Sequence, residues 1–369
     1  MRNNRTMISI IQIILIFMMV TGLKNHVIII PALLHEAGRD AWITVIIVFF
    51  PTLIWGFLIL YIYKSMKGEH IKDWLESVIG KRVTIFLLVL LGLHFLFIAA
   101  VTLKELVLWT NVSYLLKTPI LVLIILFIIP SVLVALTNLR TIVIMNFYLL
   151  FFVVIFGFFI AFTNMPHKDF TLLRPMLEHG FDPVLKAAIY QGSGMSEMFI
   201  LLVLQHRFQK KFNFFHFTVI AAILCWLTLG PLIGAIVEFG PAEASIQRYP
   251  AFEEWGLARI GIYIEHVDYL SIYQWLAGAI IRISLMIYLC IVLIRPKKKK
   301  SRKIIGISSG LLIFLLTIVP IDEHTFFILL KQFFLPLTFW VYFVSSILFG
   351  IFSRIKNRKE RGKQRVQQA

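Results

Sequence analysis

The apolar run over residues 7–34 constrains the fold of this chain more than any other stretch. Roughly 20 apolar residues cross about 30 Å of hydrocarbon, so the run is long enough to span a bilayer. Its middle is interrupted by a polar stretch that contains a glycine: Thr21, Gly22, Leu23, Lys24, Asn25 and His26. A lysine at mid-bilayer costs about 2.5–3.5 kcal/mol unless it faces a polar cavity or a partner. The run therefore predicts a discontinuous first helix that forms half of a small-molecule site.

The same run follows Arg2 and Arg5, as the apolar part of a secretory signal would. It is too long for such a signal and lacks a small-x-small cleavage site. We therefore expect it to remain in the mature protein.

The composition indicates a membrane protein along the whole chain. Of 369 residues, 59% are hydrophobic and only 15% are charged, and the mean hydropathy is +0.88. A soluble protein of this size has more charged surface. Cys225 and Cys290 lie in apolar runs, and no Cys-x-x-Cys or Cys/His ligand spacing occurs. We predict an all-α, polytopic membrane protein with two buried free thiols and without a metal, a cofactor or an enzymatic activity.

The basic residues predict the orientation in the bilayer. The formal net charge of +17 would suit nucleic acid, but the lysines and arginines cluster just beyond the apolar runs. With the N-terminus in the cytoplasm, 25 of the 36 basic residues lie on the cytoplasmic side and 9 on the other, while Lys24 and Arg282 lie inside spans. This bias is the positive-inside pattern. We expect both termini in the cytoplasm, a basic cytoplasmic tail over 353–369, and no nucleic-acid partner.

The apolar runs divide the chain into about ten spans, at 7–34, 42–63, 84–108, 119–136, 142–162, 184–205, 214–237, 269–294, 304–320 and 327–352. Glycine-interrupted runs stand first in each set of five, which is typical of an inverted-repeat transporter fold. Because each set has an odd number of spans, the second set enters the membrane from the side opposite to the first. We predict one integral membrane domain over 1–369, built as a five-plus-five inverted repeat of about 7–162 and 184–352, with helices 1 and 6 broken.

The interruption in the sixth span has the sequence Gln191, Gly192, Ser193 and Gly194, followed by Glu197. Glycines between serines predict unwinding, and unpaired backbone groups in hydrocarbon require a cavity. A half-helix beginning near Gly194 would direct its free N–H groups at a ligand carboxylate. The alternative is that the glycines only let helices pack closely, as small residues do in membranes.

Other polar groups at mid-span complete the predicted binding site. Glu197 could cap the half-helix, serve as the counter-ion of Lys24, or accept a proton. Arg282 needs a carboxylate or water at its depth. His94 and Phe97 lie mid-way along the third span, where the alternative for a lone histidine is a helix-to-helix hydrogen bond. The ammonium of Lys24 could also occupy the place that sodium takes in sodium-coupled transporters, which predicts binding without sodium.

The longest non-apolar segment, 238–268, predicts an amphipathic helix over the outer mouth. From Pro250 onward, one helical face carries Phe252, Trp255, Arg259, Ile260, Tyr263, Ile264 and Val267. The residues that fall mostly elsewhere are Glu253, Glu254, Glu265 and His266. The alternative is an interfacial helix that only places its aromatic residues at the headgroups.

Short motifs in the second half resemble those of a known family. They are Arg248-Tyr249-Pro250, Arg259-Ile260-Gly261, Val267-Asp268-Tyr269-Leu270, Trp275-Leu276 and Arg282-Ile283-Ser284. Earlier similarities are Pro31, Ala37-Gly38-Arg39-Asp40-Ala41-Trp42 and Lys117-Thr118-Pro119. Over essentially the whole chain, this pattern resembles the B subunits of spore germinant receptors, the endospore germination permeases. That family resembles the amino acid-polyamine-organocation transporters, which implies the same inverted repeat.

The resemblance implies a ligand-sensing subunit in the inner membrane of a bacterial spore. Its expected partners are the lipid bilayer, an A-type membrane subunit, a C-type lipoprotein subunit and a small germinant, for which we favour an amino acid. The germinant would pass under the 250–267 helix, dock its carboxylate near Gly194, shift the helices and so trigger germination. The alternative is a proton-coupled or sodium-independent amino acid permease. A purely structural scaffold would leave Lys24, Glu197 and Arg282 unexplained.

Overall fold

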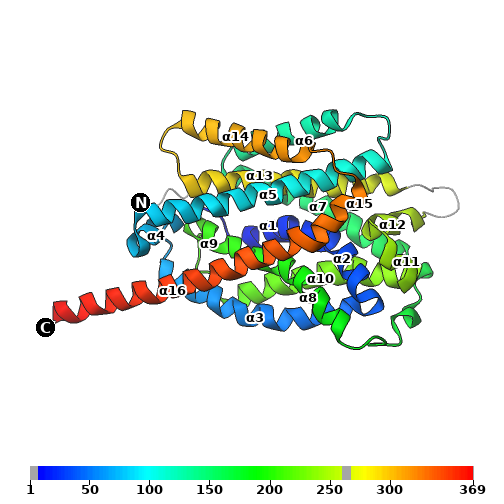
Figure 1. Ribbon diagram of the computed structural model, residues 1–369, viewed down its shortest axis with the longest axis horizontal. Coiled ribbons are helices and arrows are strands. Elements are labelled where there is room, and N and C mark those ends of the chain that lie inside the picture. Colours follow the sequence, from blue (N-terminus) through cyan, green and yellow to red (C-terminus); the bar gives the residue numbers. More distant parts are fainter. Residues whose placement is uncertain (1–6, 260–266, 369) are drawn as a thin grey trace.

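The computed structural model describes residues 7–259 and 267–368 of the chain, and this part is all-helical (Figure 1). Within it, eight helical segments are long and apolar enough to cross a membrane: Ile10–Met66, Lys81–Ser113, Leu139–Thr163, Asp182–Arg207, Phe214–Phe239, Val267–Ile294, Lys299–Ile318 and Glu323–Arg361. A ninth apolar helix, Ile120–Ala135, is shorter. The prediction of an all-α, polytopic membrane protein is therefore confirmed.

The first half of the chain, in order, contains α1 (Ile10–Leu23), α2 (Ile30–Ala37), α3 (Ala41–Met66), α4 (Ile71–Ile79), α5 (Lys81–Ser113), α6 (Ile120–Ala135) and α7 (Leu139–Thr163). Ser9 starts α1 with a capping box that it forms with Gln12. At Gly38 the backbone has a φ of +51°, which glycine adopts without strain, and the chain reverses there. The apolar segment Ile10–Met66 thus contains two passes in opposite directions (Figure 1).

The second half contains α8 (Asp182–Ser196), α9 (Ile200–Leu204), α10 (Phe214–Phe239), α11 (Pro241–Ile246), α12 (Pro250–Leu257), α13 (Leu270–Ile294), α14 (Lys299–Ile318), α15 (Glu323–Leu329) and α16 (Leu335–Gln368). Helices α8, α9 and α13 are central. The most apolar windows of Asp182–Arg207 and Val267–Ile294 are 89% and 83% buried, against 22% for α7 and 28% for α14. Glu197, just after α8, and Arg282, on α13, are therefore held inside protein, away from lipid.

The first span is not unwound, contrary to expectation. Helix α1 continues through Thr21 and Gly22, and a π-helical turn at Lys24–Ile28 then leads into α2. Pro31 stands near the start of α2, where its missing N–H costs little. The chain thus stays hydrogen-bonded while its axis is displaced by the wider turn.

The sixth span is not unwound at its glycines, and that prediction is wrong. Helix α8 remains α-helical through Gly192 and Gly194, and the departure from α-helical geometry comes later, in a 3₁₀ turn at Glu197–Phe199. The physical reason is packing: a Cβ on Gly194 would lie 1.9 Å from Asn25 Oδ1, and one on Gly192 would lie 3.0 Å from the Phe339 ring. The glycines serve close helix approach, and no half-helix begins near Gly194.

The outer segment also differs from its prediction. Helix α12 ends at Leu257, after which Ala258 is extended, so the amphipathic helix is shorter than expected. Ile260, Tyr263, Ile264, Glu265 and His266 lie outside the described residues. Glu254, which we expected away from the apolar face, is buried with 7% of its surface exposed.

Candidate functional site

Three charged side chains meet in the centre of the bundle, and each comes from a different span. Lys24 opens the π-helical turn after α1, Glu197 opens the 3₁₀ turn after α8, and Arg282 lies mid-way along α13. Their exposed fractions are 3%, 0% and 1%. Water therefore screens this charged cluster very little, and its pairing must come from protein groups.

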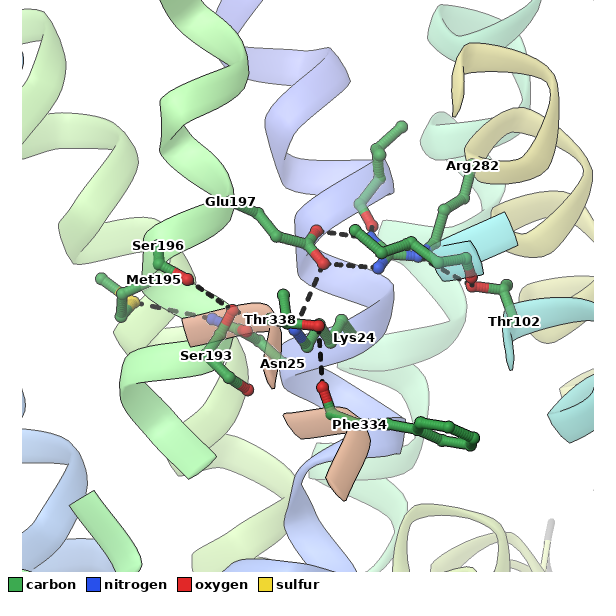
Figure 2. Close-up of polar contacts among 12 residues, drawn as sticks. Lys24, Asn25, Thr102, Ser193, Met195, Ser196, Glu197, Arg282, Phe334 and Thr338 are labelled. Carbon is green, nitrogen blue, oxygen red and sulfur yellow. Dashed lines mark hydrogen bonds and ion pairs between the residues drawn. The ribbon is translucent and has the colours of Figure 1, made fainter. Parts of the chain in front are cut away.

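Arg282 and Glu197 form a two-pronged ion pair (Figure 2). Arg282 Nη1 donates to Glu197 Oε2 at 2.7 Å, and Nη2 donates to Oε1 at 2.6 Å. The guanidinium also donates to the carbonyl of Val20 at 2.6 Å and to Thr102 Oγ1 at 3.0 Å. Such fork-shaped pairing fixes both position and orientation, so Arg282 ties α13 to α1, α5 and the end of α8.

Lys24 completes the charged cluster as a second cation. Its Nζ donates to the carbonyl of Ser193 at 2.9 Å and lies 3.3 Å from Glu197 Oε1 (Figure 2). Two cations therefore share one carboxylate, and the charged cluster carries a formal excess of +1. An uncompensated buried charge is costly, so this arrangement favours a further anion beside it.

A small cavity adjoins the charged cluster, with a volume of about 20 Å³. It is lined by Lys24, Ile28, Phe97, Ile98, Val101, Thr102, Glu197, Arg282, Leu330, Phe334, Leu335 and Thr338. Two π-helical turns, Lys24–Ile28 and Leu330–Phe334, and the 3₁₀ turn Glu197–Phe199 all contribute to this lining. Such local departures from α-helical geometry frequently mark functional positions. We call this space the charged cavity; it holds about one water molecule.

A second and larger space lies on the other side of the first span. It has a volume of about 290 Å³ and is enclosed by α1, α7, α10, α12 and α13. Its lining is largely apolar and includes the aromatic residues Phe158, Trp226, Phe252, Trp255 and Trp275. We call it the aromatic pocket. Gly22, Leu23 and His26 line this pocket, whereas Lys24 lines the charged cavity, so the structure divides the predicted first-span residues between two sites.

The remaining predicted residues lie around these sites without joining the ion pairs. Among the described residues, no hydrogen-bond partner is found for Thr21 Oγ1, His94 Nε2 or either amide atom of Gln191. His94 packs edge-on against Tyr342 with ring centres 5.0 Å apart, which differs from the helix-to-helix hydrogen bond that we considered. Phe97 packs edge-on against Phe334 at 4.8 Å. Asn25 Nδ2 lies 3.7 Å from Met195 Sδ (Figure 2).

Sequence reasoning missed three groups that the structure brings to these sites. Thr102 lies eight residues after His94, on the same helical face, and this spacing could have indicated it. Thr338 lines the charged cavity through a span in which we identified no polar site. Glu254 lines the aromatic pocket, although the helical pattern placed it away from the apolar face.

Comparisons with known proteins agree with one another. A family model described as "Spore germination protein" matches residues 6–326. The chain is 39% identical over 355 residues to spore germination protein XB of Bacillus anthracis, an alignment that covers 96% of this chain and 100% of that protein. It is 25% identical over 282 residues to the protein YfkT of Bacillus subtilis (strain 168), whose name also refers to spore germination, with 75% of each chain covered.

Proposed function

This chain belongs to the spore germination protein family, a family of membrane proteins that are not enzymes, and on that premise we propose that it is the B-type, ligand-sensing subunit of a spore germinant receptor. Its ligand is a small solute with a carboxylate, for which an amino acid is the favoured candidate. The ligand binds at mid-membrane, and its binding triggers germination.

The observation that carries the proposal is the excess positive charge beside the charged cavity. Lys24 and Arg282 share Glu197, and a lysine ammonium has three donors, of which two are directed at Ser193 and Glu197. A ligand carboxylate would take the third and cancel the excess charge. This replaces the docking position near Gly194, which the continuous α8 excludes.

Ligand binding at the charged cavity requires helices to move. A space of about 20 Å³ holds one water, so an amino acid fits only if the turns that line the cavity separate. The π-helical turns Lys24–Ile28 and Leu330–Phe334 are suited to this, because they can convert to regular helix without losing the whole hydrogen-bond ladder. For a nearly complete switch, the ligand must favour the open state by about 5 kcal/mol.

We propose that the fold is the five-plus-five inverted repeat of about 7–162 and 184–352. Counting two passes in Ile10–Met66 and adding α6 gives ten spans. Three pairs of contacts support the repeat: α1 packs on α10 as α8 packs on α3, α1 on α7 as α8 on α16, and α5 on α14 as α13 on α6. Short helices follow the second span of each half, α4 at one end of the bundle and α11 and α12 at the other (Figure 1).

We further propose that the protein lies in the inner membrane of the spore with both termini in the cytoplasm, and that the A-type and C-type subunits are its partners. Contacts at one end of the bundle support a common side for several segments. Ile8 pairs with Phe208 after α9, and Lys356 on α16 binds Glu69 beside α4 at 2.7 Å. Labelling of a cysteine introduced in the basic segment 295–303 tests the orientation, which is wrong if external reagent reaches that segment.

Deletion of the gene in the spore-former, followed by a screen of germinants, tests the proposed function. We expect the response to one germinant class to be lost and to return with the wild-type chain or with Lys117→Ala, which alters an exposed lysine. Lys24→Ala should restore it poorly. Unchanged germination, together with solute uptake by the protein alone in liposomes, would instead establish the amino acid permease.

Sodium dependence gives a further test of Lys24. The unmodified protein should bind its germinant equally well with and without sodium, because the ammonium already supplies the positive charge. A folded Lys24→Ala variant should gain sodium-stimulated binding. Sodium-dependent binding by the unmodified protein would contradict this role.

A further inference from the structure

The aromatic pocket contains a buried acid that no part of the proposed germinant site uses. Glu254 lies on α12 and lines the pocket, and it is 7% exposed. Among the described residues, its Oε1 has no hydrogen-bond partner. A Cβ on Gly234 would lie 2.8 Å from both carboxyl oxygens, so Glu254 is pressed against α10 at a glycine. A buried polar atom without a partner is rare and calls for a ligand or another explanation.

The surroundings of Glu254 leave an excess of negative charge. Glu238 lies nearby with a fully buried side chain, and Lys168 lies 3.4 Å from Glu238 Oε1. Asn164 Nδ2 donates to Glu238 Oε2 at 2.9 Å and to the backbone carbonyl of Glu254 at 2.7 Å. Two carboxyl groups thus share one lysine, which is directed at Glu238. The formal balance is −1, the reverse of that at the charged cluster.

The surroundings of Glu254 favour its protonated form. Burial, and then the negative charge of Glu238, raise the pKa of the Glu254 carboxyl well above its ordinary value, while Lys168 opposes them. A cation that entered the pocket would reverse this balance, because it would stabilise the carboxylate and release the proton.

The rest of the lining suits a cation that carries an apolar body. Trp226, Trp255 and Trp275 present large π-systems, and tryptophan is the side chain that attracts an ammonium most strongly. Phe158 and Trp226 are 44% and 52% exposed and lie 5.7 Å apart, so they mark the place where the pocket meets the lipid-facing surface. The volume of the pocket, about 290 Å³, is close to the lower end of the range for small-molecule sites.

We propose that the aromatic pocket binds a small organic amine with an apolar body, whose ammonium group pairs with Glu254 and whose body lies among the tryptophan and phenylalanine rings. This site is separate from the charged cavity and takes a ligand of the opposite charge. A lipid acyl chain could fill the same volume, but it would leave the carboxyl of Glu254 unpaired. The amine is therefore favoured over lipid.

The test compares three probes that share a phenyl body: 2-phenylethylamine, 3-phenylpropionate and 2-phenylethanol. Binding to the purified full chain in nanodiscs is followed by calorimetry and by the fluorescence of the pocket tryptophans, with empty nanodiscs to correct for partitioning. We expect the amine to bind at least tenfold more tightly than the alcohol and the carboxylate. Equal binding of all three would mean simple apolar filling, as by lipid, and would overturn the proposal.

Two variants locate the site and one serves as a control. Glu254→Gln keeps the shape but removes the charge, and it should weaken amine binding at least tenfold. Glu253→Gln alters the neighbouring exposed carboxylate and should leave it unchanged. Gly230 lines the pocket, and a Cβ there meets nothing within 4 Å, so Gly230→Leu should fill the pocket and abolish binding. Undiminished binding in Glu254→Gln or in Gly230→Leu would refute the assignment.

The outcome is independent of the germinant proposal. Lys24→Ala alters only the charged cavity, so it should leave amine binding unchanged. Loss of the germination response with amine binding intact would leave this inference standing. An intact germination response to the germinant, together with no binding of the amine, would refute the amine site and leave the germinant proposal standing.

Discussion

The charged cavity and the aromatic pocket lie on two faces of the same first span and differ in almost every physical respect. The charged cavity has about 20 Å³ of space and an excess charge of +1, and its ionic groups are paired with one another. The aromatic pocket has about 290 Å³, two carboxyl groups lie near one lysine there, and Glu254 Oε1 has no hydrogen-bond partner among the described residues. Leu23 and Lys24 are adjacent, yet one lines the pocket and the other the cavity.

The two sites hold a buried glutamate in two different ways. Glu197 makes ion pairs with both cations, so it contributes to the fold and must be displaced or joined by a ligand. Glu254 makes no ion pair among the described residues, and its raised pKa favours the protonated form, so it is available to a ligand without rearrangement. A substitution of glutamate by glutamine should therefore lower the free energy of unfolding much more at Glu197 than at Glu254.

The largest effect is expected from Glu197→Gln. The substitution leaves Lys24 and Arg282 buried without a counter-ion, and breaking a buried pair in this way costs about 3–5 kcal/mol. We expect a large loss of the free energy of unfolding, measured by denaturant titration in mixed micelles. A loss below about 1 kcal/mol would show that the cluster is not a stabilising ion pair.

Packing at the glycine of the sixth span gives the next largest effect. Gly194→Ala places a methyl group on Asn25, and overpacking of this kind costs about 1–3 kcal/mol. Gly230→Ala is the matched control, since its methyl group meets open space. We expect only the first to lower the thermal unfolding midpoint. Equal midpoints would favour an unwound helix at Gly194, which the structure contradicts.

The pH dependence of amine binding distinguishes the two sites further. Because the raised pKa favours a protonated Glu254 in the free protein and a bound ammonium group would stabilise its carboxylate, we expect binding to release a proton. Affinity for 2-phenylethylamine should therefore rise with pH, by up to about tenfold per pH unit, until Glu254 ionises in the free protein. Calorimetry over a pH series measures this slope. Glu254→Gln should abolish it, and a persistent slope in that variant would point to another group.

The smallest effect is expected for the stability of Glu254→Gln. The amide resembles the protonated acid that the raised pKa favours, and it removes no ion pair among the described residues. The free energy of unfolding should change by less than about 1 kcal/mol, within the range of ordinary substitutions. The same titration as for Glu197→Gln provides the comparison, and an equally large loss at both positions would remove the distinction.

The sequence pattern alone determined the helices of this protein, its charged residues that need partners, and its family. Apolar runs of bilayer length indicate the helices, because backbone groups in hydrocarbon must be paired within the helix. The cost of burying charge identifies Lys24, Glu197 and Arg282 as residues that need partners, wherever those partners come from. The short motifs from Arg248 to Ser284 indicated the family, and the comparisons confirm it.

Only the tertiary structure decided how these parts meet. A pair of glycines predicts unwinding and close packing equally well, and the approach of Asn25 to Gly194 decided for packing. The sequence offered Lys24 as the partner of Glu197, whereas the fold gives Arg282 the shorter contacts and adds Thr102 and a carbonyl. Glu254 lines a pocket that α7, α10 and α13 also form, so a helical pattern within α12 alone could not reveal its burial. The sequence shows that a charged residue lies within an apolar run and therefore needs a partner. Which residue is that partner depends on helices that only folding brings together.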